Sequence, residues 1–282
     1  MKEGLSLNSC FHILLKPDVF HRNILEEVIE TLGEFGVNIY VFDIIHPNEA
    51  LLCEMYDSNF KWEYDYYIHN NRLYNLGPSL SLICDSNNNK DLKAIKGASL
   101  PINDSSSSIR KRFKTKDRCL NILHIADTLF QSTKEIKLIY NNKCTSRFSQ
   151  LHNPQSSNVL LKTVSELLNP REDYCYTEIK KKLIKRIKHR IICVKYINGI
   201  FDSMSFDQNQ DYYGAGIPTE LNKLLNMSMS LDKIIHNEKT DKSIRFIDYF
   251  IALANRNMIY ISDIEKYILY GQCYYSRVNL NE

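Results

Sequence analysis

The sequence predicts an α+β protein in which a ferredoxin-like antiparallel sheet covered by helices is followed by a mainly α-helical C-terminal domain. Two observations lead to this prediction. In the first half, short apolar segments rich in β-branched and aromatic residues alternate with segments whose apolar residues recur at helical spacing. In the second half, amphipathic helical patterns continue without such short apolar segments. Alternating strands and helices of this kind suit a helix-backed sheet.

Four segments have the pattern of β-strands. Each is short, apolar and bounded by turn-forming or polar residues, which is typical of a buried strand. The third follows the break that Gly77 and Pro78 introduce. The four segments are Phe11–Leu15, Val37–Ile45, Ser79–Asp85 and Cys119–Ile125.

Helices are predicted between these strands. Apolar residues recur at helical spacing from Val19 to Phe35, and Gly36 is well placed to end that helix. Asn48 can cap the next helix, which carries Leu51, Leu52 and Tyr56. The last helix of this half is predicted from Thr128 to Tyr140.

Changes of composition along the chain predict its domain organisation. Residues 97–116 form a long irregular stretch rich in serine and basic residues, which in a compact domain is usually functional or disordered. Beyond about residue 141 a polar segment replaces the alternating pattern. We therefore expect a first domain at residues 1–145, a linker at 146–158, and a helical domain of unknown role at 159–282.

A basic amphipathic helix is predicted from Thr177 to Ile197. A solvated basic face is the favoured interpretation, with nucleic acid, an acidic membrane or a protein partner as the alternative. The alternative is weaker because no aromatic residues that could stack on bases interrupt the basic run. The apolar face consists of Ile179, Leu183, Ile184, Ile187, Ile191 and Ile192, and the basic face of Lys180, Lys181, Lys182, Lys185, Arg186, Lys188 and Arg190.

Composition excludes several classes of protein. No apolar run approaches the roughly 20 residues that span a bilayer, and the polar start MKEGLSLNSC does not resemble a secretory signal. These features predict a soluble, cytoplasmic protein. The 8 cysteines include no CxxC pair, so we expect reduced thiols and no zinc site, and a net charge of +3 does not by itself imply a polyanionic partner.

Five short motifs occur in an order and spacing that resemble those of the nucleoside diphosphate kinase family. The resemblance extends from about Phe11 to Tyr140. It implies transfer of a γ-phosphoryl group between nucleotides through a phosphohistidine intermediate. The motifs are HILLKPD at 12–18, NLGPSLSLI at 75–83, KGASLP at 96–101, SSIRKRF at 107–113 and NILHIAD at 121–127.

The same resemblance assigns candidate catalytic residues. His124 stands at the position of the phosphate-carrying histidine, and Glu135 matches the glutamate that holds the other ring nitrogen and fixes the tautomer. Read without the resemblance, His124 would more often be a buried histidine satisfied by hydrogen bonds. Likewise, Glu135 would more often be a solvent-facing charge on a helix.

Further residues are implied in binding the nucleotide and its phosphates. Cations and hydroxyl groups suit this role because phosphoryl transfer is catalysed by positioning and by stabilising negative charge. A lid aromatic would stack on the base, and Phe60, Trp62 and Tyr64 are the candidates for this role. The implied set is Lys16, Tyr56, Phe60, Lys93, Ser99, Arg110 and Asn121.

The resemblance also implies the ligands and partners. Nucleoside di- and triphosphates would be the substrates, and Mg²⁺ would arrive bridging their phosphates, with no metal site built by the protein itself. Homo-oligomerisation stays open, because Leu100 replaces an asparagine in a loop that commonly takes part in hexamer packing.

The segment after His124 departs from the family pattern. Ile125 and Ala126 stand where the family has glycine and serine, which crowds the imidazole and removes a hydroxyl that can support it. An active enzyme with a reduced rate is the leading hypothesis. The alternative is a nucleotide-binding or scaffolding protein that keeps the fold and has lost turnover.

Overall fold

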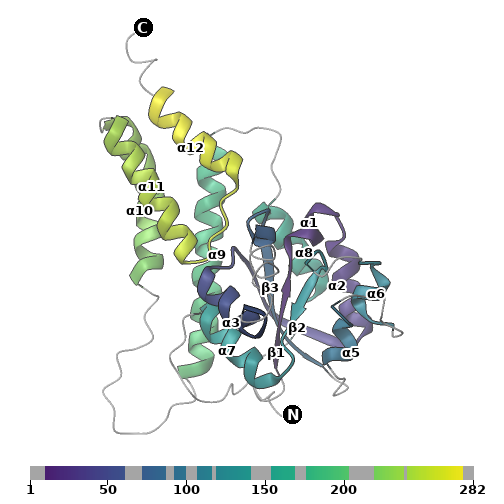
Figure 1. Ribbon diagram of the computed structural model, residues 1–282. Coiled ribbons are helices and arrows are strands. Elements are labelled where there is room, and N and C mark those ends of the chain that lie inside the picture. The colour runs from purple at the N-terminus through teal and green to yellow at the C-terminus, as the bar shows by residue number, and fades with distance from the viewer. Residues whose placement is uncertain are drawn as a thin grey trace, which may run out of the picture.

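The computed structural model contains a four-stranded antiparallel sheet with helices on both faces, as the sequence predicts (Figure 1). The strands are β1 (Phe11–Leu15), β2 (Val37–Ile45), β3 (Ser79–Ser86) and β4 (Leu123–Ile125), in the spatial order β2-β3-β1-β4. The structure describes residues 10–60, 72–86, 92–99, 107–115, 119–140, 154–168, 176–202, 219–237 and 240–275.

Three of the strands agree with the predicted segments to within one residue, but β4 is shorter than predicted. The predicted strand began at Cys119, whereas the observed strand begins at Leu123. The preceding residues form a tight turn in which Ile122 has a φ of 63°. Left-handed backbone of this kind cannot continue a β-ladder.

The helices of the first half are α1 (Pro17–His21), α2 (Leu25–Glu34), α3 (Glu49–Phe60), α5 (Leu92–Lys96), α6 (Ile109–Arg112) and α7 (Leu129–Tyr140). The single helix predicted from Val19 to Phe35 is therefore wrong. Asn23 has a φ of 54° and divides it into α1 and α2. Two boundary predictions are confirmed: Gly36, with a φ of 76°, follows the end of α2, and the Asn48 side chain accepts a hydrogen bond from the Leu51 amide at 3.0 Å.

The two faces of the sheet belong to different hydrophobic clusters. One face, represented by Ile13, Leu82 and Phe42, packs with α2 and with α8 (Ser157–Leu168). The other face includes Leu14, Val41 and Ile83 and shares a cluster with α7 and the later helices. The sheet is therefore buried on both faces.

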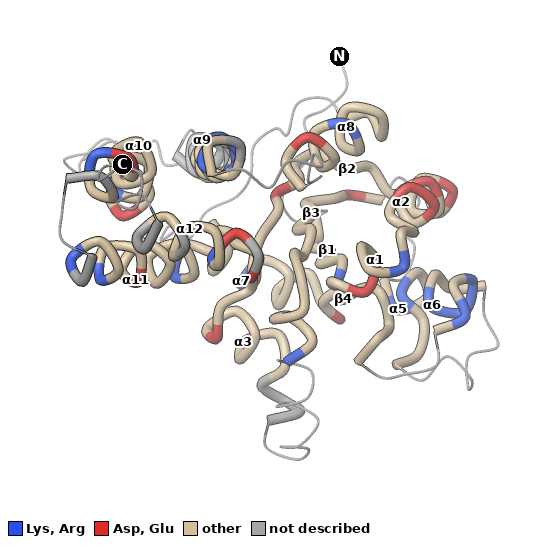
Figure 2. The backbone as a smooth tube through the Cα atoms, turned by 90° about the horizontal axis from the view of Figure 1, so that it is seen from above, with Lys and Arg blue, Asp and Glu red and all other residues tan. Residues whose placement is uncertain are grey.

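Helices beyond residue 154 cover both faces. They are α8, α9 (Tyr176–Asp202), α10 (Thr219–Asn237), α11 (Thr240–Arg256) and α12 (Asp263–Tyr275). Helix α8 lies beside α2, whereas α9 contacts β2 and α7 and carries α10–α12 on its outer side (Figures 1 and 2). The predicted domain boundaries stay a prediction, since residues 141–153 lie outside the described chain.

Helix α9 is buried over a wider arc than the sequence predicted. Ile179, Leu183, Ile187 and Ile191 are buried as expected, but Ile192 is 63% exposed. Arg186 and Arg190 were placed on the solvated basic face, and this was wrong: both are buried. Helix α9 is central, with the sheet on one side and α10–α12 on the other. Arg186 and Arg190 are therefore covered by neighbouring elements and do not face solvent.

Within the described part of the chain, no helix combines the length and the apolar character needed to cross a membrane.

The two ion pairs made by neighbouring residues of α9 lead to a stability prediction. Arg186 contacts Glu265 at 2.7 Å with both side chains buried, whereas Lys185 contacts Glu166 at 2.6 Å with both half exposed. Arg186→Met leaves a buried carboxylate without its cation, so we expect the free energy of unfolding to fall by about 3–5 kcal/mol. Urea unfolding measures this, and Lys185→Met, the matched control, should change little. Equal losses in the two variants would contradict the assignment.

Candidate active site

A row of residues crosses one face of the sheet. Asp43 of β2 pairs with Ser81 of β3, Ser81 pairs with Leu14 of β1, and Leu14 pairs with His124 of β4. Paired residues of antiparallel strands point to the same face. His12 shares this face because it lies two residues from Leu14 on β1. Polar side chains thus gather on the face that α7 and α9 cover.

His124 is held by a carboxylate from α7. Its Nε2 lies 2.8 Å from Oε1 of Glu135, whose side chain is fully buried. Since an ionised carboxylate only accepts hydrogen bonds, the Nε2–H of His124 donates. The neutral imidazole then carries its lone pair on Nδ1. This geometry brings together the two residues that the resemblance named as catalytic.

A second histidine takes the other oxygen of the same carboxylate. Nδ1 of His12 lies 2.8 Å from Oε2 of Glu135, and both side chains are fully buried. The backbone amide of His12 donates to Oγ of Ser132, the residue three positions before Glu135 on α7. Glu135 therefore joins α7 to β1 and β4 at once.

The hydrogen bonds continue from His12 toward the interior. Nε2 of His12 lies 3.1 Å from Oγ of Ser81, which lies 3.4 Å from the Tyr140 hydroxyl. An ionised Glu135 can only accept, so Nδ1–H of His12 donates to it, and in that tautomer Nε2 accepts from the hydroxyl of Ser81. Ser81 in turn accepts from Tyr140. One consistent direction of donation thus runs along this chain from Tyr140 through Ser81 and His12 to Glu135, which accepts from His124 on its other side.

Burial and charge set the protonation of the central pair. Burial opposes ionisation of Glu135, but the charges and hydrogen bonds of His124 and His12 outweigh it and lower its pKa to about 2. Burial lowers the pKa of His124 below its ordinary value, against the opposing effect of Glu135. A charged carboxylate and a neutral His124 imidazole are the combination that a nucleophilic histidine requires.

The turn before His124 is held in a strained conformation. Ile122, which is β-branched, has a φ of 63°. Its amide donates to Oδ2 of Asp18 at 3.0 Å, and its carbonyl accepts from the amide of Lys16 at 2.8 Å. Strain of this kind persists only where surrounding contacts fix it. These contacts tie the start of β4 to the KPD segment and so help to set the position of His124.

Lys16 and Tyr56 lie together near His124. The Lys16 ammonium donates to the Cys119 carbonyl at 2.9 Å and lies 5.9 Å from the centre of the Tyr56 ring. That ring stands edge-on to the His124 ring with centroids 5.6 Å apart, and its hydroxyl lies 2.8 Å from that of Tyr74. Three of the predicted residues therefore form one buried cluster.

Arg110 and Asn121 lie close to the same strand. Arg110 is buried and donates to the carbonyls of Gly97 at 3.1 Å and of Leu123, the neighbour of His124, at 2.9 Å. Asn121 is buried in the turn before β4. The predicted loop at 97–116 thus contains the short helix α6, which carries Arg110 to the site.

The remaining predicted residues are less closely tied to His124. Lys93 on α5 and Ser99 beyond it are both exposed. Phe60 ends α3, but its side chain lies outside the described residues, as do Trp62 and Tyr64. The assignment of a base-stacking aromatic therefore stays a prediction.

Residues that the sequence did not single out complete the site. Lys96 donates to the Ile125 carbonyl at 2.9 Å and contacts Asp127 at 2.6 Å, so it fixes the segment after His124. His12, Ser81 and Ser132 also went unnoticed. The sequence did contain a signal for His12, which is an ionisable side chain inside an apolar strand. Such a side chain is expected to be buried, and a buried polar group needs a hydrogen-bond partner.

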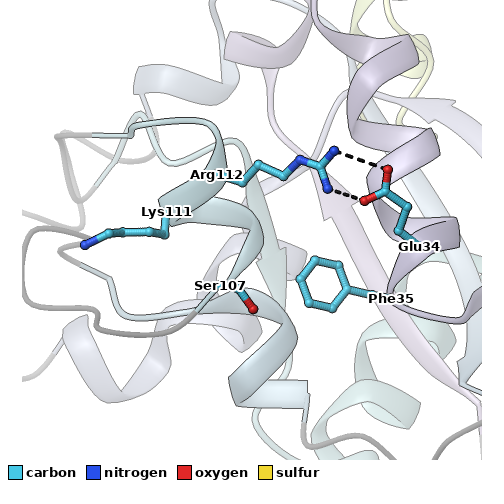
Figure 3. A pocket seen from close by; sticks show the side chains of 5 residues that line it. All are labelled: Glu34, Phe35, Ser107, Lys111 and Arg112. Carbon is cyan, nitrogen blue, oxygen red and sulfur yellow. Dashed lines mark hydrogen bonds and ion pairs between the residues drawn. The ribbon is translucent and has the colours of Figure 1, made fainter.

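A surface pocket of about 390 Å³ lies elsewhere, between α2 and α6 (Figure 3). Its lining includes the paired Glu34 and Arg112, with Phe35, Ser107 and Lys111 around them. This pocket contains none of the predicted catalytic residues. The candidate site is therefore defined by the residues that surround His124 and not by this pocket.

Comparisons with known proteins point to one family. The family model "Nucleoside diphosphate kinase" matches residues 10–144. A nucleoside diphosphate kinase of Thermobifida fusca (strain YX) is 25% identical over 129 residues, which are 45% of this chain and 93% of the relative. The residues that the family model matches all precede α8.

Two solved structures are also similar to part of the chain. A nucleoside diphosphate kinase from Encephalitozoon cuniculi aligns with a TM-score of 0.42 and 20% identity, over 46% of this chain and 86% of its own. A nucleoside diphosphate kinase family protein from Babesia bovis aligns with a TM-score of 0.40 and 17% identity, over 45% and 85% respectively.

The position of His12 leads to a prediction for a matched pair of variants. His12→Leu removes a hydrogen bond from a buried carboxylate, so the free energy of unfolding at pH 7 should fall by about 1.5–3 kcal/mol. His12→Asn places an amide donor where Nδ1 stood and should lose less. Urea unfolding distinguishes them. If the leucine variant were as stable as the wild type, His12 would not be supporting Glu135.

Proposed function

Because residues 10–144 form a domain of the nucleoside diphosphate kinase family, we propose that the chain is a nucleoside diphosphate kinase. It would transfer the γ-phosphoryl group of a nucleoside triphosphate to a nucleoside diphosphate through a phosphohistidine on His124. The observation that carries this proposal is the 2.8 Å contact between Nε2 of His124 and Glu135, which leaves Nδ1 as the nucleophilic atom.

In the first half-reaction, the Nδ1 lone pair attacks the γ-phosphorus. The new N–P bond forms as the bond from the γ-phosphorus to the β,γ-bridging oxygen breaks, and the nucleoside diphosphate leaves with that electron pair. Positive charge develops on the imidazole during this step. The carboxylate of Glu135 stabilises that charge through the Nε2–H bond.

In the second half-reaction, a terminal oxygen of a different nucleoside diphosphate attacks the phosphorus of phosphohistidine. The N–P bond breaks and its electron pair returns to Nδ1. His124 is regenerated in its starting tautomer because Glu135 holds Nε2–H throughout. The carboxylate itself is held on its other side by His12, which is therefore proposed as a positioning residue.

Fixed positive charges support binding of the phosphates. Lys16 lies beside Tyr56 and His124, and Arg110 lies against the strand that carries His124. Cations placed in advance lower the barrier because they need not reorganise as negative charge moves. Lys93, Ser99 and Asn121 remain proposed contacts of the nucleotide, and Tyr56 is proposed to pack against the reacting ring.

Mg²⁺ is proposed to enter as part of the nucleotide substrate, where it neutralises phosphate charge. Glu135 is committed to two imidazoles and Asp127 to Lys96. Neither carboxylate is needed for the ion, because Mg²⁺ retains phosphate and water oxygens readily.

A second candidate is a nucleotide-binding protein that has lost turnover. Ile125 and Ala126 are buried beside His124 and provide no side-chain hydroxyl, which favours this candidate. Against it, His12 supplies Glu135 with a second donor, so the carboxylate stays fully supported without a hydroxyl at position 126. The support for Glu135 makes turnover the preferred proposal.

The test is transfer of label through the protein. Wild type is incubated with γ-labelled ATP and Mg²⁺ and then chased with GDP. We expect acid-labile label on the protein that moves to GTP. His124→Ala should take up no label, and the matched control His21→Ala should behave as wild type because His21 is an exposed histidine bonded to the Leu76 carbonyl.

Two results would contradict the proposal. If the wild-type protein binds nucleotide but neither takes up label nor forms GTP, the second candidate, a nucleotide-binding protein without turnover, is the correct function. Label retained by His124→Ala would show that a different residue is the nucleophile.

A further inference from the structure

Three potential metal ligands from distant parts of the chain meet where α9 packs on β2. They are Asp43 of β2 and His189 and Cys193 of α9, and their ligand atoms all lie within 4.8 Å of one another. Residues four apart on a helix point the same way, which brings His189 and Cys193 together. Asp43 and Cys193 are buried, and the His189 side chain is 18% exposed.

The distances are close to those of a tetrahedral zinc site. Sγ of Cys193 lies 3.6 Å from Nε2 of His189, and Oδ1 of Asp43 lies 4.0 Å from the same nitrogen. Zinc bound at about 2.3 Å to sulfur and about 2.0–2.1 Å to nitrogen and oxygen separates its ligands by about 3.3–3.6 Å. The Cys193–His189 pair already has this spacing. Oδ1 of Asp43 has to approach the other two ligand atoms by at most about 1.5 Å to reach it.

One oxygen of Asp43 is held in place while the other faces the cluster. Oδ2 contacts Arg190 at 2.5 Å, whereas Oδ1 is buried and has no hydrogen-bond partner among the described residues. Carboxylates that bind metals are commonly held in this way by a hydrogen bond to their second oxygen. A buried carboxylate oxygen without a partner carries a cost that a bound cation would remove.

The charges of the site also suit a divalent cation. A thiolate and a carboxylate neutralise Zn²⁺, provided that Cys193 loses its thiol proton to solvent on binding. Arg190 has further partners for its own charge: the carbonyls of Ile139 and Asn257 and the face of the Tyr140 ring. Arg190 therefore keeps these partners when Asp43 binds the cation.

The Phe42 carbonyl completes the arrangement. It accepts hydrogen bonds from Nε2 of His189 at 3.2 Å and from Sγ of Cys193 at 3.3 Å. On metal binding these two donors become ligands, and the carbonyl oxygen or a water is within reach of the fourth position. The partly exposed His189 provides a route for the ion to enter.

We propose that Asp43, His189 and Cys193 form a Zn²⁺ site that fastens α9 to β2. The sequence predicted no zinc site because it contains no CxxC pair. The proposed ligands instead include two residues four positions apart on α9, His189 and Cys193. The third ligand, Asp43, lies on a strand 146 residues before His189. The role is structural and does not depend on phosphoryl transfer.

Cobalt binding tests the proposal, because Co²⁺ reports thiolate coordination by its absorption. Full-length protein is stripped with a chelator and titrated with Co²⁺ without nucleotide. We expect a thiolate-to-cobalt charge-transfer band that saturates at one equivalent and is removed by Zn²⁺. Cys193→Ser should abolish the band, and Cys53→Ser, an exposed cysteine on α3, should keep it.

His189→Gln provides a second variant whose side chain is partly exposed, so it serves if Cys193→Ser does not fold. We expect it to weaken Co²⁺ binding by more than about tenfold, the scale of loss seen when groups around metal sites are removed. No band in the wild type, a band that survives Cys193→Ser, or unchanged affinity in His189→Gln would overturn the proposal.

Discussion

The carboxylate of Glu135 is the group on which the candidate site depends. A buried charge of this kind is strongly unfavourable unless it is paired, and here each oxygen is paired with a different imidazole. The same contacts fix where α7 sits relative to β1 and β4. Orientation of His124, choice of its tautomer and docking of α7 thus follow from one interaction.

The same requirement extends across the sheet. One face carries His124, His12, Ser81 and Asp43, so neither solvent nor a purely apolar helix suits it. Helix α7 supplies Glu135, and α9 supplies Arg190, which contacts Asp43 and lies over the Tyr140 ring at 5.2 Å. Tyr140 is also the last member of the chain of hydrogen bonds that reaches His12. Of the helices beyond residue 154, α9 is therefore packed against the same polar row that contains the proposed nucleophile.

The sequence predicted those parts of the fold that depend on local pattern. Strands β1 and β2 are marked by apolar and β-branched residues, and their bounds agree with the prediction. The contact of His124 with Glu135 was implied by the resemblance to the family. His12 and Arg190 could not be predicted, because their roles depend on partners more than 100 and about 50 or more residues away, respectively. The early end of the first predicted helix depends on the left-handed Asn23, which apolar spacing does not reveal.

The protonation state of the His124 ring decides whether Nδ1 is the nucleophilic atom, and it can be measured. Imidazole ¹⁵N NMR of the free protein, with His124→Ala to assign the signals, reports which nitrogen is protonated and at which pH the ring titrates. We expect a proton on Nε2, a lone pair on Nδ1 and a titration midpoint below the ordinary value of 6.5, because burial outweighs the opposing charge of Glu135. A proton on Nδ1 at neutral pH, or a midpoint above 6.5, would contradict it.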